Sequence, residues 1–115
     1  MRKELRLRRA QLFDKTYKEG KSIAAADVVL CWLYLEPGIP TRAGFSISKK
    51  VGNAVTRNRV KRRLKSILES AADSLRSGYI IVLIGRPPAA EAAFGELKKS
   101  VRRLLKRAEI LEGDQ

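Results

Sequence analysis

The sequence predicts a single α+β domain, an α–β sandwich in which helices cover one face of a small sheet. Segments with apolar residues at helical spacing alternate with strand-like segments in the order helix, strand, strand, helix, strand, helix. A length of 115 residues with a hydrophobic fraction of 44% is sufficient for one hydrophobic core. No internal repeat or linker divides the chain, so residues 1–115 are expected to form one domain.

The N-terminal segment predicts a basic arm followed by a short helix. Residues 1–9 are rich in Arg and Lys, and we expect this arm to be mobile or to become ordered only on binding. A helix is expected at about residues 10–19, with Gly20 as a suitable C-terminal stop. The pattern leaves room for one more short strand near residues 20–24.

Two strands are expected next, at residues 27–36 and 42–48, on either side of a turn that contains Pro and Gly. We expect them to pair as an antiparallel hairpin, with Gly44 at a bulge or at a point of close approach. Strand alternation places Cys31 on the face opposite to Trp32.

A basic helix is expected from Asn53, a natural N-cap, to about Ser74. It combines cations with an apolar seam, which consists of Val60, Leu64, Ile67, Leu68 and Ala71. Because a helix turns about 100° per residue, Asn58, Arg62 and Lys65 share the side opposite to that seam.

The C-terminal third predicts a strand, a helix and a loose end. Residues 79–84 are apolar on both faces, which is typical of a central strand. Two prolines end this strand, and a last helix is expected from about residue 89 to 108. Residues 109–115 have lost the periodicity and are expected to be frayed.

Charge and composition restrict the function. A net charge of +13 favours a polyanionic partner, and nucleic acid is a better candidate than a membrane surface. The chain has no His and one Cys, which excludes zinc fingers, Ser–His–Asp triads and an internal disulfide. No apolar run could span a bilayer and no secretory signal is recognisable, so we expect a cytoplasmic protein without a membrane partner.

The start of the basic helix is suited to contact phosphate groups. Free backbone N–H groups and the helix macrodipole favour anions there, and Arg57 and Arg59 flank Asn58 at this end. A solvated helix face is the alternative, but such faces usually mix signs. No acidic residue lies between Glu36 and Glu69, so nothing local neutralises these cations.

Phe13 and Tyr17 lie one helical turn apart, beside Lys15 and Lys18. Aromatic residues among cations suit the stacking of unpaired bases, and the same spacing also suits ordinary core residues. Both interpretations stay open at this point.

A catalytic centre within this chain alone is poorly supported. Glu69 and Asp73 are one helical turn apart and could hold a metal, but such a pair on an amphipathic helix is more often solvated surface. The glycines form no phosphate-binding loop.

The block from Gly44 to Arg62, GFSISKKVGNAVTRNRVKR, resembles the hallmark of the protein subunit of bacterial ribonuclease P. Its Arg-Asn-Arg core corresponds to the RNR motif of that family. The resemblance extends to residues 13–20 and to residues 79–82 followed by Arg86-Pro87, so it covers nearly the whole chain.

The resemblance implies an unusual left-handed crossover into and out of the basic helix, against the usual right-handed rule. It also implies a ribonucleoprotein that removes the 5′ leader of precursor tRNA by phosphodiester hydrolysis. The RNA subunit would supply the active site and the magnesium ions, and the protein would hold no cofactor alone and no small-molecule substrate. The implied partners are the ribonuclease P RNA and precursor tRNA.

The resemblance also assigns site residues. Leader binding is implied in a cleft between the first helix and the sheet, and Asn58 is a candidate for an outer-sphere contact to a cation. Many family members have an aromatic residue where this chain has Cys31, and a thiol cannot stack on a base. The implied cleft residues are Phe13, Lys15, Tyr17, Cys31 and Ser48. The implied RNA-facing residues are Lys49, Lys50, Asn53, Arg57, Asn58, Arg59, Lys61, Arg62 and Lys65.

Three other functions are less well supported. A basic ribosomal or RNA-chaperone-like protein would explain the charge without a catalytic partner. A protein that reads the DNA major groove is disfavoured because no helix-turn-helix pair precedes the basic helix. A free-standing nuclease is disfavoured because there is no His and no convincing carboxylate cluster.

Overall fold

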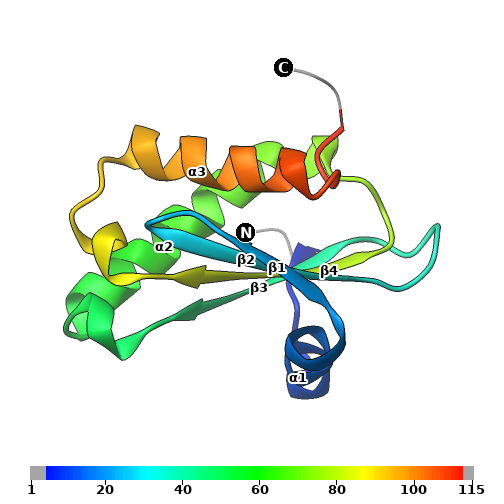
Figure 1. The fold of residues 1–115 in the computed structure, drawn as a ribbon, viewed down its shortest axis with the longest axis horizontal. Coiled ribbons are helices and arrows are strands. Elements are labelled where there is room, and N and C mark those ends of the chain that lie inside the picture. The colour runs from blue at the N-terminus through cyan, green and yellow to red at the C-terminus, as the bar shows by residue number, and fades with distance from the viewer. Residues whose placement is uncertain (1–4, 113–115) are drawn as a thin grey trace.

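Four strands form one mixed sheet in the computed structural model, which describes residues 5–112 (Figure 1). The strands are β1 (Lys21–Ala24), β2 (Val28–Tyr34), β3 (Arg42–Ile47) and β4 (Tyr79–Gly85). Their order in space is β1-β2-β4-β3. β2 is antiparallel to β1 and to β4, whereas β3 runs parallel to β4. The α+β class and the additional strand near residues 20–24 are confirmed.

The expected hairpin between the strands at residues 27–36 and 42–48 is wrong, because β4 lies between β2 and β3. Ile81, Val82 and Leu83 are 0% exposed, so both faces of β4 are covered. An interior position buries this strand more completely than a position at the sheet edge would. The prediction of a central strand at residues 79–84 is confirmed.

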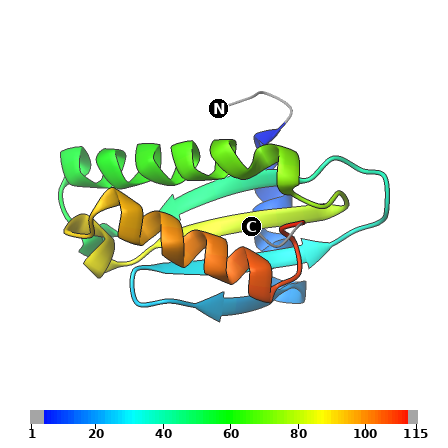
Figure 2. The ribbon, with the colours of Figure 1, turned by 90° about the horizontal axis from the view of Figure 1, so that it is seen from above.

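Two helices lie side by side on one face of the sheet (Figures 1 and 2). They are α2 (Ala54–Ala71) and α3 (Phe94–Arg107), and a 3₁₀ turn, Ala72–Ser74, continues α2 to the expected end. Their apolar seams meet the strands in the main core. The seam residues are Val60, Leu64, Ile67, Leu68, Leu97, Val101, Leu104 and Leu105, all buried.

Helix α2 connects β3 to β4 by a left-handed crossover. In Figure 2 the helix lies in front of the sheet, and both strands run in the same direction. When the picture is turned so that the two strands point upward, β4 lies to the left of β3. A right-handed connection would place β4 on the right. The hand implied by the family resemblance is therefore present.

The last helix is shorter than the sequence predicts. Pro87–Ala90 form a short 3₁₀ helix, and α3 begins only at Phe94. Two successive prolines fix the backbone after β4, and Ala93 is extended before the helix starts. Phe94, the first residue of α3, is exposed.

Helix α1 (Ala10–Glu19) packs on the opposite face of the sheet, so the expectation of helices on one face only is wrong (Figure 1). A second, smaller cluster lies under it, in which Cys31, Ile80 and Val82 contact Leu12 and Phe13. Cys31 therefore lies on the α1 face, whereas Trp32 packs against the main core, as strand alternation predicts.

Both ends of the described chain are more ordered than expected. Leu5 and Leu7 are buried, and the Leu7 N–H donates to the carbonyl of Ala43 on β3 (2.8 Å), so the basic arm is fixed from residue 5 onward. Ile110 and Leu111 are also buried, which contradicts fraying at residues 109–112. In both segments apolar side chains fill gaps in the core. Residues 1–4 and 113–115 of these two predictions lie outside the described residues.

Candidate nucleic-acid interface

Helix α2 begins at a side-chain cap, as predicted. Asn53 Oδ1 accepts a hydrogen bond from the Thr56 N–H (2.9 Å), and the Asn53 carbonyl accepts from the Arg57 N–H (2.9 Å). The first turn contains no acidic residue. The positive end of the macrodipole is therefore left to an external anion.

The loop before α2 presents two lysines. Lys49–Val51 form a 3₁₀ turn, in which Ser48 Oγ accepts from the Lys50 N–H (3.2 Å) and Val51 is buried. Lys49 and Lys50 are exposed. Val51 anchors the turn in the core and leaves the lysines in solvent. Ser48 contributes to the loop by capping this turn.

The exposed side of α2 carries the predicted cations. Asn58, Lys61 and Arg62 are exposed, and Lys65 is partly exposed. Burial lowers the pKa of Lys65, and the nearby positive charges of Lys61 and Arg6 lower it further. Arg6 therefore joins this surface from the N-terminal segment, a role that the sequence pattern did not reveal.

A cleft of about 230 Å³ lies between β3 and the first turns of α2. Phe45 and Ile47 of β3 form its apolar side, and Arg57, Asn58 and Lys61 form its polar side. The Arg57 Nε is buried and has no hydrogen-bond partner among residues 5–112. The cleft thus combines an aromatic ring, an amide and two cations within reach of one nucleotide.

Arg59 lies on another side of the helix. Its guanidinium donates to the Ala90 carbonyl (3.0 Å), and Arg63 donates to the Ala92 carbonyl (3.1 Å). The two arginines are one helical turn apart and hold the segment that precedes α3 against α2. The RNA contact predicted for Arg59 stays a prediction, and the structure assigns this side chain a packing role as well.

A second surface lies between α1 and the sheet. Phe13 covers Gly44, where a Cβ atom would come within 2.2 Å of the ring. Gly44 is therefore a point of close approach, as the sequence suggested. Tyr17 is 46% exposed and its hydroxyl pairs with the side chain of Ser46. Burial raises the pKa of Tyr17, while the hydrogen bond with Ser46 opposes the increase.

The other predicted cleft residues differ in position. Cys31 is buried beneath Phe13, and this burial raises the pKa of its thiol. Lys15 is exposed, and a helix turns it about 200° away from Phe13, so it does not line the cleft floor. Ser46 was not predicted, although strand alternation with Gly44 could have identified it.

Strand β3 joins the two surfaces because its side chains alternate between the faces of the sheet. Gly44 and Ser46 face α1, whereas Phe45 and Ile47 pack on the side of α2. The aromatic surface at α1 and the basic surface at α2 are therefore opposite faces of one edge strand.

Among residues 5–112, no group of three or more His, Cys, Asp or Glu side chains could hold a metal ion, and the Glu69–Asp73 pair gains no third ligand. Within the same residues, no helix has the length and apolarity needed to cross a membrane.

Comparison with known proteins gives a consistent result. A family model described as Ribonuclease P matches residues 1–109. The chain is 39% identical over 112 residues to the ribonuclease P protein component of Symbiobacterium thermophilum, covering 97% of each chain. It is 40% identical over 114 residues to that of Caldanaerobacter subterraneus subsp. tengcongensis, again covering 97% of each.

Solved structures show the same fold. The RNase P protein of Staphylococcus aureus superposes with a TM-score of 0.85 at 29% identity, covering 94% of this chain and 98% of that one. The RNase P protein from Thermotoga maritima superposes with a TM-score of 0.78 at 29% identity, with the same coverage.

Proposed function

The chain belongs to the ribonuclease P protein family, and we propose that its two surfaces divide the binding of precursor tRNA and of the ribonuclease P RNA between them. It is a ribonuclease P protein component and acts in the processing of the tRNA 5′ leader. Its partner in the ribonucleoprotein is an RNA. The precursor tRNA, the position of the leader and the division of catalysis are parts of the proposal.

The single observation that carries the proposal is the placement of both surfaces on β3. The α1 surface offers the half-exposed ring of Tyr17 beside a polar hydroxyl at Ser46, which suits an unpaired base. The α2 surface offers cations and a helix N-terminus without acidic residues, which suit a phosphate backbone. The single-stranded leader would follow the α1 surface while structured RNA contacts the α2 surface.

We assign hydrolysis to the RNA subunit. The described part of the chain has no cluster of metal ligands, so we derive no metal-dependent step from its side chains. Magnesium, which phosphodiester hydrolysis by this ribonucleoprotein would use, belongs to the RNA in this proposal, with Asn58 as a candidate for an outer-sphere contact. The lone cysteine is compatible with the cytoplasm, where we place this activity.

A reconstitution assay tests the proposal. The purified protein is added to a bacterial ribonuclease P RNA at low magnesium, together with precursor tRNA that carries a labelled 5′ leader. We expect cleavage at the mature 5′ end with both components and none with the protein alone. Tight binding to structured RNA without restored cleavage would instead favour a basic RNA-binding protein that lacks a catalytic partner.

A further inference from the structure

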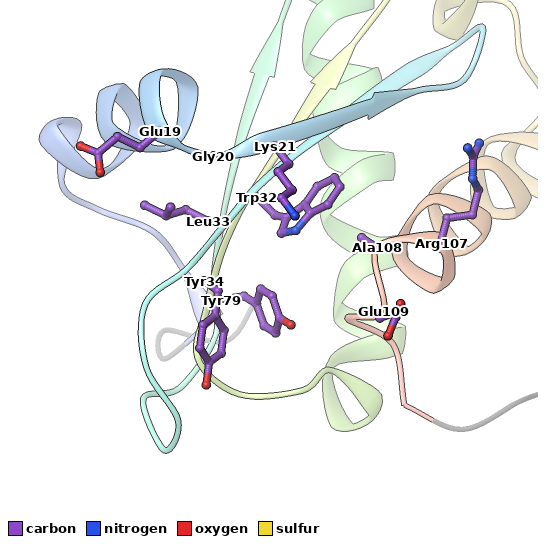
Figure 3. Close-up of a pocket in the computed structure, with 10 residues that line it drawn as sticks. All are labelled: Glu19, Gly20, Lys21, Trp32, Leu33, Tyr34, Tyr79, Arg107, Ala108 and Glu109. Atoms are coloured by element: carbon purple, nitrogen blue, oxygen red, sulfur yellow. The ribbon is translucent and has the colours of Figure 1, made fainter.

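A pocket of about 490 Å³ lies at the C-terminal end of α3, where β2 ends and β1 begins (Figure 3). Its volume is within the range of about 300–1,000 Å³ that is usual for small-ligand sites. The pocket lies outside the basic surface of α2 and outside the Phe13–Tyr17 surface. Helix α1 contributes only its C-terminal end, Glu19 and Gly20, to the lining. None of the functions assigned above uses this pocket.

Three aromatic side chains form one wall of the pocket. Figure 3 shows Trp32, Tyr34 and Tyr79 grouped on the strands, opposite Arg107 and Glu109 at the end of α3. The rings of Tyr34 and Tyr79 meet edge to face, with centroids 5.0 Å apart and an interplanar angle of 61°. Tyr34 is nevertheless 50% exposed.

The backbone of Gly78 holds the ring of Tyr34 in place. A Cβ atom at Gly78 would come within 2.7 Å of its ring, so the ring lies directly against this backbone. A half-exposed aromatic ring that is fixed by its neighbours loses little conformational entropy on binding. This arrangement is suited to stacking against a planar group.

Glu109 carries a backbone strain at the rim of the pocket. It is the one residue other than glycine with positive φ (62°) among residues 5–112. Two hydrogen bonds close a Schellman turn around it, from the Glu109 N–H to Lys106 (3.0 Å) and from the Ile110 N–H to Leu105 (2.9 Å). Glycine is the usual residue at this position, so the carboxylate is kept here at a cost in stability.

The pocket lining balances two cations against two carboxylates, and the excess positive charge lies beside it on α3, which suits a ligand with both a phosphate group and an amine donor. Arg107 and Lys21 line it together with the carboxylates of Glu19 and Glu109. The outer side of α3 continues the positive charge, and its one acidic residue, Glu96, pairs with Lys99 (3.9 Å). The cations of this helix are Lys98, Lys99, Arg102, Arg103, Lys106 and Arg107.

We propose that this pocket binds one unpaired nucleotide of an RNA strand whose backbone follows α3, and that the base of this nucleotide carries an exocyclic amine. The base stacks on Tyr34, and its exocyclic amine donates to the carboxylate of Glu109. The phosphates contact Arg107 and the cations that precede it on the helix. This site is additional to the proposed leader-binding site. It gives the protein a further RNA-binding surface on the α3 side.

Trp32 allows a direct test, because it is the only tryptophan of the chain and it lines this pocket. Its side chain lies on the face of the sheet opposite to Cys31 and Phe13, so we expect its fluorescence to respond more strongly to this pocket than to the Phe13–Tyr17 surface. Pentaadenylate is titrated into the protein while Trp32 fluorescence and the anisotropy of the labelled oligonucleotide are recorded. We expect saturable quenching that follows the anisotropy, and weaker quenching with pentauridylate, which has no exocyclic amine.

Four variants complete the test. Tyr34→Leu is expected to weaken the quenching constant about tenfold, since base stacking on an aromatic ring is lost. Glu109→Gly is expected to weaken pentaadenylate binding while it raises the Tm, a combination that general unfolding could not produce. Arg107→Gln is expected to weaken quenching and reduce its salt dependence, whereas Lys18→Gln on α1 is the matched charge control.

Some results would overturn the proposal. Binding seen by anisotropy without a change in Trp32 fluorescence would locate the oligonucleotide elsewhere. Equal quenching of the wild type and of Tyr34→Leu, or equal quenching by inorganic polyphosphate, would reduce the site to nonspecific charge. The titration contains no ribonuclease P RNA, so its failure leaves the reconstitution result unaffected, and a failure of reconstitution leaves the titration unaffected.

Discussion

The ring of Phe13 lies directly on the backbone of Gly44, where a Cβ atom would be only 2.2 Å from the ring Cζ. This contact fixes how closely α1 approaches β3. It also decides that Tyr17, one helical turn further, reaches Ser46 on the same strand. The geometry of the α1 surface therefore depends on one glycine in a strand, a position where glycine is otherwise unfavourable.

Gly44→Ala is expected to lower the free energy of unfolding by about 1–3 kcal/mol, because the Phe13 ring must move away from an overpacked site. Chemical denaturation measures the loss. Gly95→Ala is the matched control, since nothing lies within 4 Å of a Cβ there and alanine favours the helix. We expect that control to be neutral or to stabilise. A loss of the same size in both variants would mean that Phe13 does not depend on Gly44.

Tyr17→Ala is expected to weaken binding of precursor tRNA with a 5′ leader by about 1–3 kcal/mol, while mature tRNA binds as before. Tyr17 is a cleaner probe than Phe13 because it is 46% exposed and contributes less to the core. Equilibrium binding to both RNAs measures the difference. Tyr17→Phe retains the ring and removes the hydroxyl that pairs with Ser46, so it should retain most of the discrimination. Equal weakening for both RNAs would contradict leader stacking.

Arg62→Ala and Arg59→Ala are expected to have different effects. Arg62 is exposed, so its loss should reduce the slope of log K against log salt by about 0.7–0.9 for one phosphate contact. Arg59 donates to Ala90, so its loss should lower the Tm and change the slope less. Salt titrations of RNA binding and thermal unfolding separate the two. Identical slopes and Tm values in both variants would show that the hydrogen bond to Ala90 has no consequence in solution.

Lys65→Gln is expected to stabilise the free protein at neutral pH and to weaken RNA binding. The pKa of Lys65 is lowered by burial and by Lys61 and Arg6, so its charge is less favourable in the folded state than in the unfolded state. The unfolded state then binds more protons, and stability rises as the pH passes from the folded pKa toward the ordinary value of 10.5. The stabilising effect of the substitution should therefore disappear in that range. Thermal unfolding against pH, with Lys18→Gln as control, measures it, and an advantage that persists to high pH would contradict this origin.

Local patterns in the sequence were sufficient for most elements and for the basic surface of α2. Helix spacing, the Asn53 cap and the absence of acids between Glu36 and Glu69 predicted α2 and its exposed cations. Such features depend on residues within a few turns of one another, and neighbours in the chain are enough to determine them. The apolar stretch at residues 79–84 likewise predicted a central strand, because both of its faces had to be buried.

Contacts between distant segments decided the rest. Three features depend on which apolar surfaces pack against each other. They are the insertion of β4 between β2 and β3, the hand of the crossover, and the ordering of residues 5–9 and 109–112. The same holds for Arg59, whose partner at Ala90 is 31 positions away, and for Arg6 beside Lys65. A local pattern shows only whether a side chain is apolar or charged. Which surface covers it is settled by the burial of the whole core, since that free energy is shared among segments far apart in the chain.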